Sequence, residues 1–249
     1  MNKHNEEVIE TTLLRGRVKL LQPKVGFHAS VDSVFLAAAA PVRDRFHVLD
    51  VGCGVGSVGL CIYARNQNIH LTGIDFQDDL VDLARQNAQL NGLGARGRFF
   101  HGDISTEKYI EDNGFNLAVM NPPYLASGAH TASPERIKAA SHGDGGVTLG
   151  GWVKYAHRKL KAGGNLALIH RADRLDDAIN ALTQRKWFGS LVILPLYSHE
   201  GEPAKRVIIR ARKERYAPLV LRSGLIVHKE NGKYTREADA LLSGAAGIP

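Results

Sequence analysis

The sequence predicts an α/β fold, in which one doubly wound, mostly parallel sheet carries helices on both faces. Apolar, strand-like runs alternate with helical patterns along most of the 249 residues. One such run, residues 47–51, leads into glycines at alternate positions (Gly52, Gly54 and Gly56) and then into a helical run, which is how nucleotide-binding α/β folds begin. Polar residues also follow several predicted strands at their ends. This length suffices for one large domain with a substantial core.

The elements can be assigned in chain order. Residues 31–40 form the first predicted helix, with Ser30 as a possible cap and Pro41 as its stop. The glycine turn then joins a strand ending at Asp50 to a helix over 57–65. Alternating patterns give the remaining elements: strand 70–75, helix 77–91, strands 98–101 and 115–120, helix 149–160, strand 165–170, helix 173–186, and strands 191–194 and 206–210. The last two strands are separated only by a loop, so they can pair antiparallel.

We expect one domain over residues 1–249, with a core of about 26–213, an N-terminal lead-in over 1–25 and a basic C-terminal tail over 214–249. Neither Cys53 nor Cys61 belongs to a zinc-binding pattern, so no metal is expected. A polar N-terminus and the lack of an apolar run of about 18 residues argue against secretion and a membrane span. These features predict a cytoplasmic protein and leave monomer and homodimer open.

The charge is formally +7, from 32 Lys plus Arg against 25 Asp plus Glu. Such a balance favours a polyanionic partner such as RNA. Basic residues cluster in the acid-free stretch 11–31 and again in 205–215. Lys205 and Arg206 are the candidates for substrate phosphates, and solvated surface charge is the alternative for both clusters.

Two acids follow predicted strands near the glycine turn. Asp75 ends the second strand, where its carboxylate can accept ribose hydroxyls. Asp50 precedes the glycines, where it would repel a pyrophosphate but attract an ammonium group. Asp50, together with the corner at Asn121 that hydride transfer leaves unexplained, favours S-adenosylmethionine over a dinucleotide. Asp103, after the third strand, is either a cofactor contact or a helix cap.

The most informative stretch is Asn121-Pro122-Pro123-Tyr124, directly after an apolar strand. Prolines fix the backbone there and cannot continue the strand ladder. The resulting corner presents a carboxamide, carbonyls and an aromatic face, a combination suited to a planar amino group. We expect the Asn121 side-chain oxygen and the Pro122 carbonyl each to accept one amine hydrogen, while Tyr124 stacks on the base.

Together, the glycine turn and this corner resemble class I S-adenosylmethionine-dependent methyltransferases that modify exocyclic amino groups. The resemblance covers roughly residues 26–213 and implies a seven-stranded mixed sheet of order 3-2-1-4-5-7-6. It also implies cofactor contacts by the three glycines and by a further set of residues: Asp32, Asp50, Asp75, Phe76, Asp103, Ile104 and Asn121.

Residues 24–33 resemble the lead-in of tRNA-adenine methyltransferases related to the enzyme that acts at position 37 of valine tRNA. In that group an aspartate, matched by Asp32, opens a helix that closes over the cofactor. His28 and Ala29 stand where the group commonly has arginine and phenylalanine.

The leading functional hypothesis is methylation of the exocyclic amine of adenine in RNA, with tRNA the favoured substrate. One alternative is methylation of a glutamine side-chain amide in a release factor, which uses the same corner. Another is a non-catalytic RNA-binding module that keeps the fold. The absence of a large target-recognition insert disfavours DNA adenine methylation.

Overall fold

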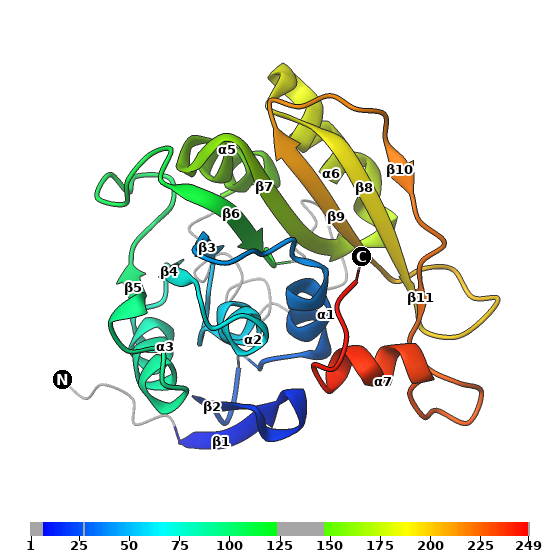
Figure 1. Ribbon diagram of the computed structural model, residues 1–249, viewed down its shortest axis with the longest axis horizontal. Coiled ribbons are helices and arrows are strands. Elements are labelled where there is room, and N and C mark those ends of the chain that lie inside the picture. Colours follow the sequence, from blue (N-terminus) through cyan, green and yellow to red (C-terminus); the bar gives the residue numbers. More distant parts are fainter. Residues whose placement is uncertain (1–6, 27, 124–146, 249) are drawn as a thin grey trace, which may run out of the picture.

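A computed structural model describes residues 7–26, 28–123 and 147–248, which form a mixed sheet covered by helices on both faces (Figure 1). The seven longer strands are β3 (His47–Val51), β4 (His70–Asp75), β5 (Gly97–His101), β6 (Phe115–Met120), β7 (Leu160–Arg171), β8 (Phe188–Tyr197) and β9 (Arg206–Lys213). Counted from β3, they lie in the order 3-2-1-4-5-7-6, with β9 antiparallel to both of its neighbours.

The sheet has nine strands in the described part of the chain, not the seven expected. The two additional strands, β10 (Val220–Leu221) and β11 (Leu225–Ile226), pair parallel with the outer edge of β8. They come from the stretch predicted as a basic tail. A strand of two residues is too short to show the alternation of apolar and polar residues from which strands are predicted.

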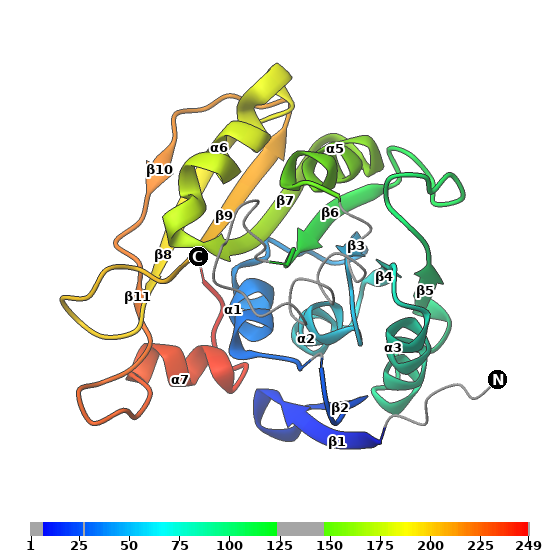
Figure 2. The same cartoon turned by 180° about the vertical axis from the view of Figure 1, so that it is seen from behind.

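Helices α1 (Val31–Ala39), α2 (Ser57–Arg65) and α3 (Asp78–Leu90) cover one face of the sheet, and α5 (Leu149–Lys159) and α6 (Leu175–Thr183) cover the other (Figures 1 and 2). Strand β3 contributes to both cores, since Val48 packs on the first face while Leu49 and Val51 pack on the second. A strand buried on both faces has no polar side to expose, which explains why Val48, Leu49 and Val51 are apolar on both of its faces.

Two further regions for which the sequence predicted no element contain regular secondary structure. The first is an N-terminal hairpin of β1 (Val8–Leu13) and β2 (Val18–Pro23), and the second is helix α7 (Arg236–Leu242). In Figure 1 the hairpin lies below α2 and α3, and α7 lies below α1. Helix α7 is held by Arg65, whose guanidinium donates to the Leu241 carbonyl at 2.6 Å and the Ala246 carbonyl at 2.5 Å.

Asparagine side chains on α3 attach the hairpin to the domain. The Asn87 amide accepts from Leu21 N–H at 2.7 Å and donates to the Leu21 carbonyl at 2.9 Å. One helical turn later, Asn91 makes the same pair of bonds to Lys19, at 2.9 and 2.7 Å. The two asparagine side chains thus take the place of a neighbouring strand along the open edge of β2. They provide hydrogen-bond partners for the N–H and carbonyl groups of Leu21 and Lys19.

Several basic residues of the 11–31 stretch have partners within the chain. Arg15 pairs with Asp239 at 2.6 Å, Arg17 donates to the Ala64 carbonyl at 2.5 Å, and Lys24 pairs with Glu7 at 2.8 Å. These contacts tie the hairpin to α2, to α7 and to its own first strand, which favours a structural role for the stretch. No helix among the described residues combines the length and the apolar character needed to cross a bilayer.

Candidate active site

The sheet register brings three predicted site residues to one edge. Val51 of β3 lies beside Ile74 of β4 and Met120 of β6, so the residues that follow project from neighbouring strand ends. Gly52, Asp75 and Asn121 line one cavity of about 310 Å³. The remaining lining residues are His28, Ser30, Asp32, Ile74, Phe76, Gln77, Leu80, Gly102, Asp103, Ile104, Pro122, Pro123, Val147 and Trp152. The carboxyl ends of parallel strands are where such folds bind ligands.

Asp75 is oriented by the backbone around it. Its Oδ2 accepts from Gly54 N–H at 2.7 Å and its Oδ1 from Gln77 N–H at 2.9 Å. Burial raises the pKa of this carboxyl, against the lowering effect of these hydrogen bonds. Each carboxylate oxygen can accept a second hydrogen bond, so the side chain fits the two hydroxyls of a ribose.

Gly52 is required by a close contact with a tryptophan. Its backbone has φ +65°, and a Cβ there would lie 2.2 Å from the Trp152 ring. A side chain at this position would therefore both strain the backbone and displace the indole. Gly54 and Gly56 do not line the cavity: the first donates to Asp75, and the second caps α2 with φ +86°. The three glycines shape the turn, but only Gly52 borders the cavity.

Asp50 is not among the residues that line the cavity, and its contact with the cofactor's ammonium group stays a prediction. It is 1% exposed, and its Oδ2 accepts from Gly59 N–H at 2.9 Å in the first turns of α2. Burial raises the pKa of this carboxyl to about 7. Asp50 is close in sequence to the residues that line the cavity. Because side chains alternate between the two faces of a strand, its carboxylate points toward α2 instead.

Asp103 and Ile104 line the cavity after β5, as the resemblance implied. The Asp103 Oδ1 also accepts from Ser105 N–H at 2.7 Å, so this side chain caps the following turn while bordering the cavity. The two interpretations of Asp103 are therefore compatible.

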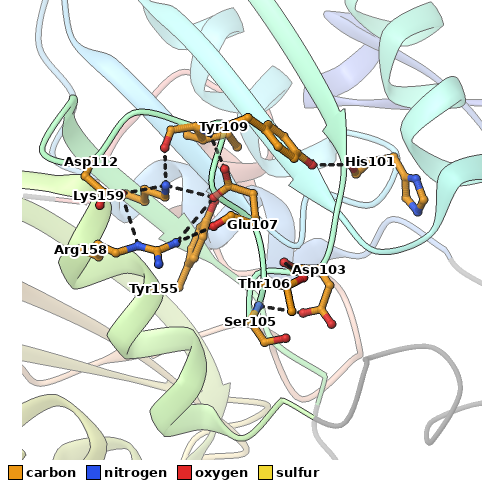
Figure 3. A network of polar contacts seen from close by, with 11 residues as sticks. His101, Asp103, Ser105, Thr106, Glu107, Tyr109, Asp112, Tyr155, Arg158 and Lys159 are labelled. Atoms are coloured by element: carbon orange, nitrogen blue, oxygen red, sulfur yellow. Dashed lines mark hydrogen bonds and ion pairs between the residues drawn. The ribbon is translucent and has the colours of Figure 1, made fainter.

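The loop that carries these two residues is held by a buried ion network (Figure 3). The Glu107 side chain is fully buried; its Oε2 accepts from Tyr155 OH at 2.8 Å and lies 3.0 Å from Lys159 Nζ. Lys159 also pairs with Asp112 at 2.8 Å, and Arg158 donates to the Glu107 carbonyl at 3.0 Å. Burial alone would raise the pKa of Glu107, but the Ile110 N–H, Lys159 and Tyr155 hydrogen bonds outweigh it and lower the pKa.

The Asn-Pro-Pro corner ends β6 as expected, with Asn121 partly buried and Pro122 buried. Tyr124 lies outside the described residues. Asp32, in the first turn of α1, lines the cavity and accepts from Arg206 Nε at 3.1 Å. This bond gives Arg206, expected to meet substrate phosphate, a carboxylate partner at the cavity wall. Lys205 is 66% exposed and 3.8 Å from Glu202.

Several residues that line the cavity were not predicted from the sequence. Trp152 belongs to no motif, and its place under Gly52 follows only from the packing of α5 on the sheet. His28 was noted only as a departure from an arginine. The resemblance of residues 24–33 to the tRNA-adenine methyltransferase lead-in was the available signal for His28. Gln77 and Leu80 could have been found from their place in the first turns of the helix after Asp75.

The strand order with β9 antiparallel, the glycine turn and the acid after the second strand are the features that the resemblance to S-adenosylmethionine-dependent methyltransferases implied. Residues 23–184 match the methyltransferase small domain model, and the chain belongs to that family. Its cofactor is S-adenosyl-L-methionine. The cavity fits this cofactor, since Asp75 presents a carboxylate for ribose and Gly52 leaves room for close backbone approach. Among the described residues no three His, Cys, Asp or Glu side chains are grouped to hold a metal.

Two kinds of named relatives align with this chain. A tRNA1(Val) (adenine(37)-N6)-methyltransferase of Porphyromonas gingivalis is 31% identical, over 77% of this chain and 76% of the relative. The enzyme of that name from Dickeya chrysanthemi is 26% identical over 84% of both chains. A release factor glutamine methyltransferase of Bacillus anthracis is 32% identical, but over only 33% of this chain and 28% of its own.

Solved structures share the fold. A predicted O-methyltransferase from Agrobacterium tumefaciens aligns with a TM-score of 0.71 and 25% identity, over 87% of this chain and 98% of the other. TrmN from Thermus thermophilus aligns with a TM-score of 0.52 and 18% identity, over 74% of this chain and 48% of the other.

Proposed function

We propose that this enzyme methylates the exocyclic amino group of adenine in RNA, with tRNA as the substrate. The observation that carries the proposal is the shared cavity: the Asn121-Pro122-Pro123 corner borders the same space as Asp75 and Gly52. Relatives that align along most of the chain and are named for adenine N6 methylation of tRNA support it.

The corner suits the chemistry of an aromatic amine. The lone pair of such an amine is spread into its ring, which makes the nitrogen a poor nucleophile. Hydrogen bonds from the amine to the Asn121 side-chain oxygen and the Pro122 carbonyl would direct the lone pair out of the ring plane. When bound, the cofactor supplies an electrophilic methyl group, and positioning accounts for much of the rate gain. The Asn121 amide has no proton-transfer role in this scheme, because methylation itself acidifies the nitrogen.

The target base has to leave its stack or loop to reach the cavity. Lys205 is the exposed cation of the 205–206 pair and is proposed to contact substrate phosphate beside the site. Arg206 is already paired with the Asp32 carboxylate at 3.1 Å, which offsets part of the positive charge that it could offer to a phosphate.

Methylation of a release-factor glutamine is the second candidate, favoured by the local similarity to release factor glutamine methyltransferases. That similarity covers a third of this chain, whereas the tRNA enzymes align along most of it. The amide of glutamine is planar like an aromatic amine, so the corner alone does not separate the two.

The test is incubation of the enzyme with methyl-labelled S-adenosylmethionine and cell extract, followed by ribonuclease or protease. The proposal predicts label that ribonuclease releases and that nucleoside analysis identifies as N6-methyladenosine. Label released by protease would support glutamine methylation instead, and label on an oxygen atom of RNA would exclude the amine assignment.

A further inference from the structure

A buried polar side chain lies on the inward face of the N-terminal hairpin. The inward positions of β2 are Val18, Leu20 and Gln22, and Gln22 is only 5% exposed. A polar group buried without partners is costly, so an amide in this position has to be hydrogen-bonded. Its partners belong to the segment that leads to α1: Oε1 accepts from Ala29 N–H at 3.0 Å, and Nε2 lies 3.1 Å from His28 Nδ1.

These two contacts determine which way round the amide lies. A backbone N–H is always a donor, so the atom facing Ala29 must be the Gln22 oxygen. The other end of the side chain is then the NH₂ group, which can only donate. His28 Nδ1 therefore accepts, and the imidazole carries its proton on Nε2. A proton on Nδ1 would place two donors against each other.

His28 borders the cofactor cavity, together with Ser30 and Asp32 from the same segment. Because Nδ1 is engaged by Gln22, Nε2–H is the ring group left to meet a ligand. The hairpin that carries Gln22 is itself fixed to α3 by the Asn87 bonds to Leu21, the residue next to Gln22. The cavity wall is therefore connected by hydrogen bonds to the helix after Asp75.

We propose that Gln22 is a positioning residue that holds His28 as its Nε2–H tautomer, and that His28 donates a hydrogen bond to a bound ligand in the cavity. The ligand group is a hydrogen-bond acceptor, either an oxygen of the cofactor or a ring nitrogen of the target base. The tautomer and a contact to the cofactor need only the methyltransferase cavity, whereas a contact to the target base rests on the proposed function.

The tautomer is measured directly by two-bond ¹H–¹⁵N correlation spectra of the protein, with the His28 signals assigned by comparison with His28→Gln. A protonated Nε2 and an unprotonated Nδ1 are expected in the protein alone. An Nδ1–H ring, or rapid exchange between tautomers, would overturn the proposal. This measurement uses the unaltered protein and does not depend on whether any Gln22 variant folds.

The ligand is identified in the same spectra by adding S-adenosylhomocysteine and then tRNA. A shift of His28 Nε2–H with S-adenosylhomocysteine alone assigns the acceptor to the cofactor, and a shift only after tRNA assigns it to the target. If His28 responds to neither addition, the ligand contact is wrong.

The variant Gln22→Glu tests whether Gln22 sets the tautomer of His28 or only stabilises the fold. The carboxylate keeps the bond from Ala29 N–H but turns the second contact into an acceptor, which favours a proton on His28 Nδ1. We expect the tautomer to reverse and the identified ligand to bind about tenfold more weakly. Gln89→Glu, which adds the same charge at an exposed site on α3, should change neither. An unchanged tautomer in folded Gln22→Glu protein would contradict the role of Gln22.

Discussion

The cavity is bounded by two kinds of structure that differ in how they are specified. Gly52, Asp75 and Asn121 come from the ends of adjacent parallel strands, and each is placed by its own strand. The flanking walls are held instead by residues distant in the chain: Glu107 reaches Tyr155 across 48 residues, and Asn87 reaches Leu21 across 66. Strand ends therefore position the groups that contact ligands. Polar contacts between residues distant in the chain stabilise the cavity walls around those groups.

The two walls also differ from each other in chemistry. The loop after β5 depends on buried charges, whereas the contacts that attach the hairpin to α3 are neutral amides. Breaking a buried ion pair leaves an uncompensated charge, while losing an amide leaves unpaired but neutral backbone groups. The charged wall should consequently be the more sensitive to single substitutions and to acid.

Asn121→Ala should have the largest effect, and it should act on turnover. Removing the side chain that orients the amine should lower kcat on the order of 10²- to 10³-fold, by analogy with loss of one polar group that stabilises a transition state. Affinity for S-adenosylhomocysteine, measured by calorimetry, should stay within about twofold. Asn116→Ala is the matched control, since Asn116 lies at the opposite end of β6 and binds His47 N–H at 3.0 Å. Near-normal turnover by Asn121→Ala would remove this residue from the mechanism.

Glu107→Gln should have the largest effect on stability. Lys159 would lose its buried partner but keep Asp112, so we expect a loss of about 3 kcal/mol in the free energy of unfolding, near the lower limit for a broken buried pair. Denaturant unfolding measures it, with the exposed Glu111→Gln in the same loop as the control.

The same variant tests the acid sensitivity of the charged wall. The pKa of Glu107 is lowered in the folded state, so its stabilisation is present above the ordinary glutamate range and is lost as pH falls through the folded pKa. The difference between wild type and Glu107→Gln should therefore shrink in acid. A difference that stays constant with pH would contradict the ion-pair account.

Asn87→Ala should cost less, about 2 kcal/mol, because it leaves the Leu21 backbone groups unpaired without burying a charge. The cost should not depend on pH between about 5 and 8, and the hairpin amides should exchange hydrogen faster. Asn91→Ala, whose bonds to Lys19 are more exposed, should destabilise less. An Asn91 variant that is the more damaging of the two would reverse our ranking of these contacts.

Asp50→Asn should change how stability depends on pH, rather than lower stability equally at every pH. Because the pKa of Asp50 is raised to about 7, the native state binds more protons than the unfolded state between about pH 4 and 7. Stability contributed by this group should fall as pH rises through that range, by up to about 1.4 kcal/mol per pH unit, and Asp50→Asn should remove the slope. Asp79→Asn, an exposed acid on α3, is the control. A large loss of S-adenosylhomocysteine affinity in Asp50→Asn would restore the ammonium contact that the structure does not support.

The features at the strand ends could be predicted from the sequence, whereas those held by contacts between distant residues could not. The strand alternation and the glycine turn were readable because they depend on local patterns, and they predicted the α/β sheet and the edge where Asp75 and Asn121 meet. Asp50 shows a limit of such patterns: its side chain accepts from Gly59 N–H of α2, because neighbouring positions on a strand face opposite sides and a residue next to the turn need not face the cavity. The hairpin and Trp152 could not be predicted, since an Asn pair that replaces a strand and an indole beneath a glycine are defined only by the folded chain.

The central claim is that one cavity brings the cofactor and the Asn-Pro-Pro corner together. An experimental structure with S-adenosylhomocysteine tests it most directly. The account predicts ribose hydroxyls on the Asp75 carboxylate and a sulfur atom that faces Asn121. A cofactor bound away from Asp75, or with its sulfur turned from the corner, would contradict it.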